Sequence, residues 1–232
     1  TYYTAQAAQF DQLPPEDWGV LDPDLPDIHH LGDTLVKLCA SDASYMERGL
    51  GFARNVKNYL FRRRQVRRLE WLEMGLTAAR HLAGQHPDEI DTYRRREALF
   101  LNELGSAWSA LGERRKAINY YEEALPIDRS LGNRGGEATT LNNIGRVWDD
   151  LGEKRKALEF YEQALPLYRD VEDRGGEATT LNNIGMVWRQ LGETKKALDF
   201  YQQALPLQGA VGDRSGEATT LNNIGRVWDD LG

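Results

Sequence analysis

The segment Glu137-Ala138-Thr139-Thr140-Leu141-Asn142-Asn143-Ile144-Gly145 returns unchanged at Glu177–Gly185 and again at Glu217–Gly225, so successive copies start 40 residues apart. The identity is longer between the first and third copies, because residues 137–152 and 217–232 agree letter for letter. A less well preserved copy runs over residues 101–140. A period of this length is typical of repeat proteins, in which each copy is one supersecondary unit.

Within one copy the apolar residues recur at the spacing of an α-helix. On a wheel of about 100° per residue, one side of residues 138–151 is apolar and the other side is polar. The apolar side holds Ala138, Leu141, Ile144, Gly145, Val147, Trp148 and Leu151. The polar side holds Thr139, Asn142, Asn143, Arg146, Asp149 and Asp150. We expect Gly152 to end this first helix.

A second helix is expected to begin near Glu153, and residues 173–176 are expected to form the turn into the next hairpin. The apolar residues of this second helix are Ala157, Leu158, Phe160, Tyr161, Ala164, Leu165 and Leu167. One such hairpin cannot bury its own apolar face, so neighbouring hairpins must stack. We expect small residues such as Gly145 to let backbones approach closely, and large ones such as Tyr161 to fill the space between layers. The sequence thus predicts an all-α array.

These residues resemble the tetratricopeptide repeat (TPR) family. The matching pattern recurs in each copy and reads, in the best preserved one, Leu141, Ile144, Gly145, Trp148, Gly152, Ala157, Tyr161 and Ala164. The resemblance implies a right-handed TPR superhelix, an α-solenoid of antiparallel helical hairpins, and binding of a protein or peptide rather than catalysis. The period of 40 residues is longer than that of the standard repeat, which is about 34 residues. It is similar to that of kinesin light chain and of the Leu-Gly-Asn-type polarity adaptors.

We expect three regions along the chain. Residues 1–42 are predicted to be a linker with a short helix that joins an upstream module. Residues 43–87 are predicted to form a divergent TPR-like hairpin, with helices over about 43–62 and 65–82. Residues 88–232 are predicted to be a TPR array of about three and a half 40-residue repeats, in which the last copy has only its first helix. For that reason we expect the chain to be a fragment of a longer protein.

The Asn-Asn-Ile-Gly and Ala-Leu-Pro-Leu motifs also resemble long arrays in bacterial multidomain proteins. Such arrays follow a STAND-type (NB-ARC or NACHT) ATPase or accompany a CHAT protease domain. Residues 18–38 resemble the segment that links a STAND ATPase module to its repeats. This resemblance implies the ligand-sensing region of a signal-transduction ATPase. Two alternatives remain: an adaptor or scaffold, CHAT-associated or kinesin-light-chain-like, and a structural spacer without a ligand.

The candidate binding residues lie on the polar side of the first helices. In the TPR family this helix lines the concave surface, so the resemblance implies a groove lined with asparagines. An asparagine amide offers both donors and acceptors, which suits the backbone of an extended peptide. In related arrays the second asparagine of each pair does this work. The candidate set is Asn102, Asn142, Asn143, Arg146, Asp150, Asn182, Asn183, Met186, Asn222, Asn223 and Arg226. The alternative is a solvated helix face whose asparagines bond to the neighbouring hairpin.

Specificity is expected from the positions of this groove that differ between copies. One such position holds Ser106, Arg146, Met186 and Arg226 in turn, and the groove therefore alternates in charge. A uniform cationic clamp for a plain acidic terminus is not expected.

Composition and missing motifs exclude several functions. The net charge of −7 argues against a nucleic-acid partner, and no apolar run approaches the about 18 residues of a membrane span. The chain has no Gly-Lys pair, no His-Glu-x-x-His and no Gly-x-Ser-x-Gly, so we predict no enzyme, no cofactor and no metal site. Cys39 is the only cysteine, which excludes an internal disulfide and favours a cytoplasmic location.

The last predicted helix, over residues 217–231, has no second helix after it in this sequence. Its apolar stripe, which is Leu221, Ile224, Val227, Trp228 and Leu231, is therefore expected to be bare or to serve as a cap. Exposed apolar patches favour association, and we predict end-to-end self-association through this helix.

Overall fold

The computed structural model describes residues 69, 72, 73 and 75–231 of the chain. Apart from residue 69, these belong to one compact unit, Leu72–Gly232. The predicted linker over residues 1–42 and most of the predicted hairpin over residues 43–87 lie outside the described residues. The described part of the chain consists of helices joined by short turns and has no strand.

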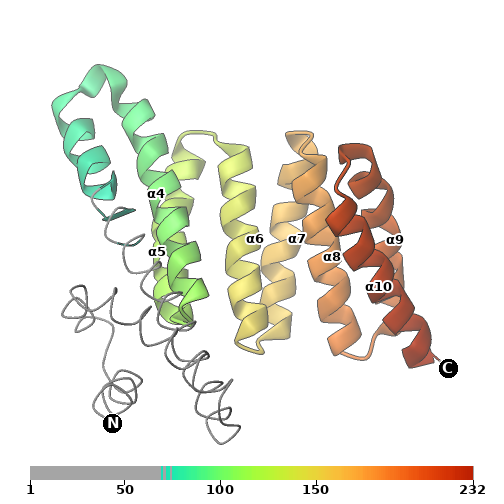
Figure 1. The fold of residues 1–232 in the computed structure, drawn as a ribbon. Coiled ribbons are helices and arrows are strands. Elements are labelled where there is room, and N and C mark those ends of the chain that lie inside the picture. Colours follow the sequence, from blue (N-terminus) through green and yellow to red (C-terminus); the bar gives the residue numbers. More distant parts are fainter. Residues whose placement is uncertain (1–68, 70–71, 74, 232) are drawn as a thin grey trace, which may run out of the picture. The chain divides into compact units, whose positions relative to one another are not determined.

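Seven α-helices follow one another along this described unit (Figure 1). Helical residues 75–85 and a 3-10 turn, η3 (Pro87–Glu89), come before them. The helices are α4 (Ile90–Ala110), α5 (Arg114–Ser130), α6 (Arg134–Asp150), α7 (Lys154–Asp170), α8 (Arg174–Gln190), α9 (Thr194–Val211) and α10 (Arg214–Leu231).

The helices pair in chain order into antiparallel hairpins. The most extensive contacts join α4 to α5, α6 to α7 and α8 to α9, and each hairpin then packs on the next first helix. We refer to α4, α6, α8 and α10 as the first helices and to α5, α7 and α9 as the second helices. This arrangement confirms the predicted all-α solenoid of helical hairpins.

The first helices begin earlier than the sequence pattern predicts. Residues 173–176 were expected to be a turn, but Arg174–Gly176 form the first turn of α8. The carboxylate of Asp173 accepts a hydrogen bond from the backbone N–H of Gly176 at 2.9 Å and so caps the helix. Gly176 is required there because a Cβ atom would lie 2.3 Å from the ring of Tyr168.

A tyrosine from each second helix fills a notch in the first helix of the same hairpin. Tyr161 is completely buried, and a Cβ atom on Gly145 would lie 2.7 Å from its ring. The pairs Tyr121 with Gly105 and Tyr201 with Gly185 repeat this contact. The close approach predicted at Gly145 is therefore confirmed, and it fixes how near the two helices of a hairpin can lie.

The first helix α6 lies between two second helices, and α8 is placed in the same way. Ala138 and Leu141 of α6 pack on Ala164 and Tyr168 of α7. Another side of α6, with Ile144 and Val147, packs on α5 through Tyr121 and its neighbours. The last helix, α10, packs on the preceding second helix, α9, through Val227 and Ile224.

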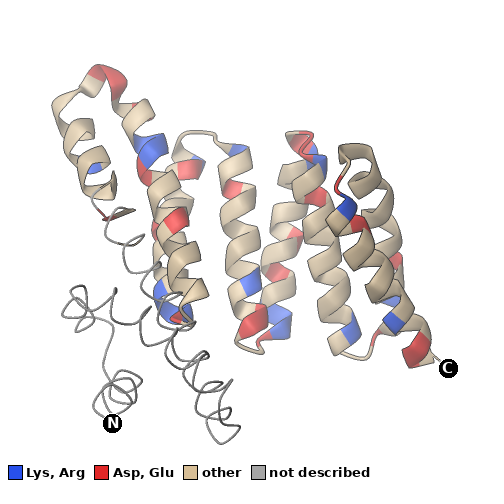
Figure 2. Cartoon of the chain, in the orientation of Figure 1, with Lys and Arg blue, Asp and Glu red and all other residues tan. Residues whose placement is uncertain are grey.

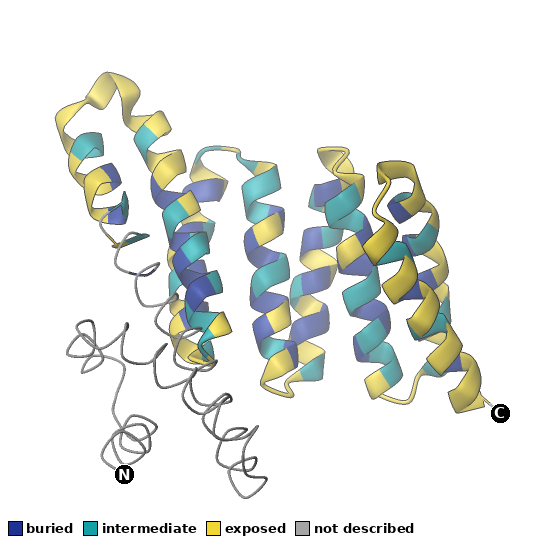
Figure 3. Ribbon diagram, in the orientation of Figure 1, coloured by how far each residue is buried: buried dark blue, intermediate teal, exposed yellow. Residues whose placement is uncertain are grey.

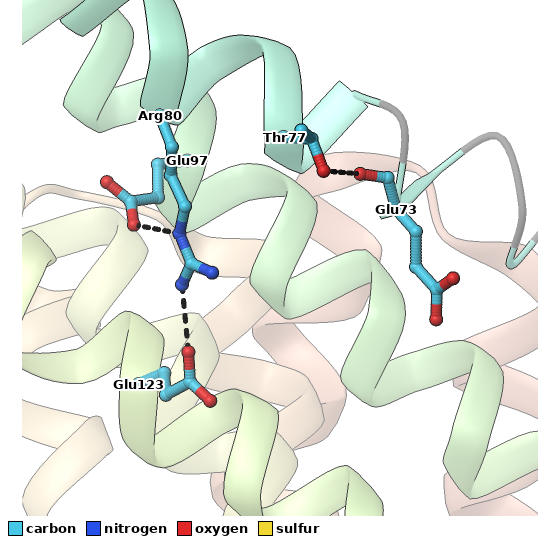
Figure 4. Close-up of polar contacts among 5 residues, drawn as sticks. All are labelled: Glu73, Thr77, Arg80, Glu97 and Glu123. Carbon is cyan, nitrogen blue, oxygen red and sulfur yellow. Dashed lines mark hydrogen bonds and ion pairs between the residues drawn. The ribbon is translucent and has the colours of Figure 1, made fainter. Parts of the chain in front are cut away.

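An arginine joins the helical residues 75–85 to the first hairpin (Figure 4). The guanidinium of Arg80 lies 2.7 Å from the Glu97 carboxylate of α4 and 2.9 Å from the Glu123 carboxylate of α5. These two hydrogen-bonded carboxylates, Glu97 above all, raise the pKa of Arg80 despite its partial burial. Nearby, the Thr77 hydroxyl donates to the Glu73 carbonyl oxygen at 2.9 Å. The preceding segment is thus attached to both helices of the first hairpin.

A buried position near the end of each second helix changes chemistry from copy to copy. It holds Asp128, Tyr168 and Gln208, each nearly inaccessible to solvent. Asp128 accepts hydrogen bonds from the Asn133 amide at 2.7 Å and the Thr140 hydroxyl at 3.3 Å. Burial raises the pKa of the Asp128 carboxyl, and these two hydrogen bonds offset the effect only in part.

The tyrosine notch predicts opposite outcomes at two glycines in identical sequence surroundings. Gly145→Leu must displace the buried Tyr161 ring and should cost about 1–3 kcal/mol or more. Gly225→Leu meets no atom within 4 Å and should leave stability equal or slightly higher, because leucine favours a helix over glycine. Thermal unfolding followed by circular dichroism compares the two variants. Equal losses in both would contradict the notch.

Asp128→Asn should remove a pH-dependent cost of folding. Below the ordinary aspartate value of 3.8 the carboxyl is protonated in both the folded and the unfolded state and costs nothing. Because the folded-state pKa is raised, the folded state becomes less favoured as the pH rises from about 4 through that pKa. The unfolding midpoint of the variant minus that of the parent chain should therefore grow between pH 4 and pH 7. A difference that stays constant over this range would refute the assignment.

Candidate functional site

The first helices share one face of the array. Contacts join α4 to α6, α6 to α8 and α8 to α10, whereas no comparable contacts join successive second helices in the described unit. Closer spacing of the first helices is what an inner, concave side requires. We call this surface the asparagine face, after Asn102, Asn142, Asn143, Asn182, Asn183, Asn222 and Asn223.

In two of the asparagine pairs the first residue, Asn142 or Asn182, connects neighbouring hairpins. The side-chain oxygen of Asn142 accepts hydrogen bonds from the Thr180 hydroxyl at 3.2 Å and the Asn183 amide at 3.3 Å. One repeat later, Asn182 accepts from Thr220 and Asn223, both at 3.2 Å. The sequence alternative, in which asparagines bond to the neighbouring hairpin, therefore describes the oxygens of Asn142 and Asn182 and one N–H each of Asn183 and Asn223.

Asn102 of α4 makes the first contact of the same series of hydrogen bonds between successive first helices, which we call the asparagine ladder. Its oxygen accepts from the Thr140 hydroxyl at 3.0 Å, and its amide donates to the Ala98 carbonyl oxygen at 3.1 Å. Both halves of the Asn102 amide are thereby engaged within the protein.

The second asparagine of each pair keeps more of its hydrogen-bonding capacity. Asn183 and Asn223 donate through the amide nitrogen, and their oxygens accept no hydrogen bond from another described residue. The half-buried Asn143 side chain makes no hydrogen bond with any residue of the described part. The exposed Asn222 likewise has no such partner there, and it corresponds to the bridging residues Asn142 and Asn182.

Sequence reasoning missed the threonines that hold this ladder together. Thr140, Thr180 and Thr220 are completely buried, although the wheel gave this position no role. The Thr140 hydroxyl lies 2.9 Å from the Gly136 carbonyl oxygen as well as 3.0 Å from Asn102. The signal that could have revealed them is the recurrence of Thr-Leu-Asn at residues 140–142, 180–182 and 220–222, whereas the less well preserved copy has Phe100 at this place.

The position that varies between copies lies beside a buried tyrosine hydroxyl. Burial raises the pKa of Tyr121, and the positive charge of Arg146 partly offsets this. Burial likewise raises the pKa of Tyr201 to about 12, against the opposing charges of Arg189 and Arg226. Arg146 and Arg226 are exposed, whereas the half-buried Met186 carries no charge.

The two aspartates at the end of α6 have different surroundings. Asp150 is exposed and lies 3.8 Å from the guanidinium of Arg114. Asp149, which the wheel placed on the polar side, is instead buried, because Lys154 at the start of α7 folds over it with Nζ 2.5 Å from Oδ1. In α8 the residue at this position is Arg189, which pairs with Asp230 at 3.1 Å. Charges of both signs are therefore interspersed along the array (Figure 2).

Two searches of the described residues bear on other functions. No group of three or more His, Cys, Asp or Glu side chains there could hold a metal ion. None of the helices in that part of the chain is long and apolar enough to cross a membrane.

The tetratricopeptide repeat family model matches residues 95–170 and 173–232, which is more than half of the sequence. The chain belongs to the tetratricopeptide repeat family. No curated protein matches the sequence closely enough to count as a relative. The TPR resemblance of the sequence is thereby confirmed, and TPR arrays of this kind are generally scaffolds for protein binding.

Solved TPR structures resemble this one in fold. BtubC (BKLC) from P. vanneervenii is 17% identical over 91% of this chain and 84% of its own, with a TM-score of 0.56. RapI in its apo form is 19% identical over 88% of this chain and 54% of its own, with a TM-score of 0.59. A single-residue variant of a putative kinesin light chain from Podosopora anserina is 13% identical over 74% of this chain and 83% of its own, with a TM-score of 0.52. At these identities the likeness is one of fold alone.

The asparagine ladder predicts that Asn142 stabilises the array and that Asn222, at the same place in an identical stretch, does not. Asn142→Ala removes two hydrogen bonds between hairpins and should cost about 1–3 kcal/mol. Asn222→Ala removes none to a described residue and should change stability by less than about 0.5 kcal/mol. Thermal unfolding of both variants is the measurement. An Asn222→Ala loss as large as that of Asn142→Ala would rule out the bridging role.

Proposed function

We propose that this TPR chain binds a protein partner by holding an extended peptide segment along the asparagine face. The observation that carries the proposal is the division of labour within each asparagine pair. The side-chain oxygens of Asn142 and Asn182 are engaged by the next hairpin, whereas Asn183 and Asn223 use only an N–H there and keep an oxygen that no described residue uses. A half-buried amide with free capacity suits a ligand that brings the missing hydrogen-bond partners.

The free atoms define what such a ligand must offer. Asn183 and Asn223 each donate one amide N–H to the preceding hairpin, and their side-chain oxygens have no donor among the described residues. Neither the oxygen nor the amide nitrogen of Asn143 is hydrogen-bonded to a described residue. Backbone N–H groups of an extended peptide supply donors to such oxygens whatever the side chains are. The affinity that these three asparagines contribute is therefore expected to be largely independent of the ligand sequence.

The varying position supplies the selectivity in this proposal. Arg146, Met186 and Arg226 follow one another from α6 to α10, so cationic places flank an apolar one. A ligand segment with acidic residues on either side of an apolar residue fits this order. We propose that such a segment, rather than a nucleic acid or a uniformly acidic terminus, is the natural ligand.

We further propose a cytoplasmic, non-enzymatic role as the sensor region of a STAND-type signalling ATPase. Two sequence features support it: the resemblance of residues 18–38 to a STAND linker, and the near-identity of the repeats, which suits a rapidly changing recognition surface. Ligand binding would then shift a closed–open equilibrium of the ATPase module. The gene sequence upstream of Thr1 tests this. A P-loop ATPase there supports the sensor, and another kind of domain would favour an adaptor or scaffold.

Substitution of the second asparagines should weaken peptide binding without unfolding the array. Peptides selected from a random display library on the parent chain serve as the probe. Asn143→Ala with Asn183→Ala should lower their affinity about tenfold, because each lost hydrogen bond costs about 0.5–1.5 kcal/mol. Titration calorimetry measures the affinity, and circular dichroism confirms unchanged helicity.

A matched control is Thr179→Ala, an exposed position one turn before Asn183 on the same helix. This substitution should leave the affinity unaltered. Selected peptides that bind the asparagine double variant as tightly as the parent would disprove the proposed groove.

A further inference from the structure

The tyrosines that pack on glycine end in hydroxyls that the protein leaves without a partner. Tyr121, Tyr161 and Tyr201 are completely buried, and their hydroxyls make no hydrogen bond with any residue of the described part. A buried polar group without a partner costs folding free energy. Packing on glycine accounts for the ring but gives the hydroxyl no task, so this cost recurs from hairpin to hairpin without a structural return.

The surroundings of the Tyr201 hydroxyl are the most cationic of the three. Gly185 of α8 receives the Tyr201 ring, and Arg189 follows Gly185 by one turn of the same helix. Arg226 of α10 contributes a second positive charge. Burial raises the pKa of Tyr201, and both arginines oppose that effect. Two cations from different helices therefore act on one unpartnered hydroxyl.

Arg189 is held in place while one of its donors stays unused. Its Nη1 lies 3.1 Å from the Asp230 carboxylate of α10, and its side chain is only 25% exposed. Its Nε–H is buried and donates to no described residue. Figure 3 shows that α8, which carries this arginine, is mostly buried or partly buried along its length. The ion pair with Asp230 thus restrains the guanidinium and leaves the Nε–H available.

Two unpartnered donors beside a further cation are complementary to an anionic oxygen. A carboxylate accepts several hydrogen bonds at once, and hydrogen bonds to an ionised group are the strong ones. Arg226 is exposed and makes no ion pair with a described residue, so it can move to admit such a group. Its exposure belongs to the position, because Arg146 is also exposed at the same place on α6, within the array.

We infer that Tyr201, Arg189 and Arg226 form a subsite for an acidic side chain of the bound peptide. The inference rests on the proposed function and names which of its two cationic places takes the carboxylate. The Tyr201 hydroxyl and the Arg189 Nε–H donate to the carboxylate oxygens, and Arg226 supplies the charge from the side of α10. We call these three residues the anion subsite.

The equivalent place one hairpin earlier lacks this combination. Beside Tyr161, the residue that corresponds to Arg189 is Asp149, and the residue that corresponds to Arg226 is Met186. Burial raises the pKa of Tyr161, and the negative charge of Asp149 raises it further. Tyr161 thus has an unpartnered hydroxyl of the same kind in surroundings that repel an anion, and it is a matched control.

The test compares Tyr201→Phe with Tyr161→Phe in the 232-residue chain. Each variant keeps the ring that packs on glycine and loses only an unpartnered hydroxyl, so neither should lower the thermal unfolding midpoint. The probe is a peptide selected from a random display library on the parent chain. Its companions are the same peptide with glutamine in place of each acidic residue in turn.

Titration calorimetry should show a loss of affinity of about fivefold or more with Tyr201→Phe and of less than about twofold with Tyr161→Phe. One glutamine-bearing peptide should lose affinity by a similar factor and should bind Tyr201→Phe and the parent chain equally, because both changes remove the same interaction. The Nε–H signal of Arg189 in the nitrogen-15 NMR spectrum, identified with Arg189→Lys, should shift with the selected peptide and not with that glutamine-bearing one.

Several results would overturn the inference. They are selected peptides without acidic residues, equal effects of the two phenylalanine variants, and an Arg189 signal that stays in place. A lower unfolding midpoint of Tyr201→Phe would also overturn it, because the hydroxyl would then have a partner within the chain.

The asparagine double variant separates this inference from the proposed function. Weaker binding by Asn143→Ala with Asn183→Ala, together with full binding by Tyr201→Phe, would keep the asparagine face and reject the anion subsite. Coupling between Tyr201 and the peptide carboxylate, with no effect of the asparagine changes, would keep the anion subsite and reject the extended-peptide mode.

Discussion

The packing of a tyrosine ring on a glycine sets the geometry on which the whole array depends. Tyr161 occupies the space that a side chain at position 145 would need, so the two helices of the hairpin are held at one separation and one register. Because the same contact recurs at Tyr121 and Tyr201, the three hairpins α4–α5, α6–α7 and α8–α9 of the described part are held together in the same way. Identical hairpins stack by the same operation each time, and that produces a regular solenoid rather than a closed bundle.

Regular stacking explains why the polar contacts between hairpins also repeat. Once neighbouring first helices lie at a constant spacing, an asparagine on one can reach a threonine on the next, as Asn142 reaches Thr180 and Asn182 reaches Thr220. Burial strengthens these bonds, because a hydrogen bond is electrostatically stronger in the low-dielectric interior than in water. The tyrosine–glycine packing therefore fixes the spacing of the helices, and the hydrogen bonds of the asparagine ladder depend on that spacing.

The fold can be predicted from the sequence because two patterns agree: the 40-residue period, and the helical spacing of apolar residues within each copy. Leu141, Ile144 and Val147 lie in the core as the wheel predicts. The helical wheel fails at positions where a residue of another helix determines burial or hydrogen bonding. Asp149 is buried because Lys154 of the next helix covers it, and Asn142 is partly committed to the array because Thr180 and Asn183 reach it from the next repeat. A single-helix pattern contains no information on such partners.

The same reasoning separates positions that build the array from positions that are free to vary. Gly145 and Tyr161 occupy complementary space, so a larger residue at one position must be compensated by a smaller one at the other. The position of Arg146 and Met186 is less constrained by packing, since it holds an exposed arginine in one copy and a half-buried methionine in the next. Copies can therefore differ in charge at this position while remaining interchangeable as structural units. An array built in this way can change the charge of one repeat at a time without altering the stacking of its hairpins.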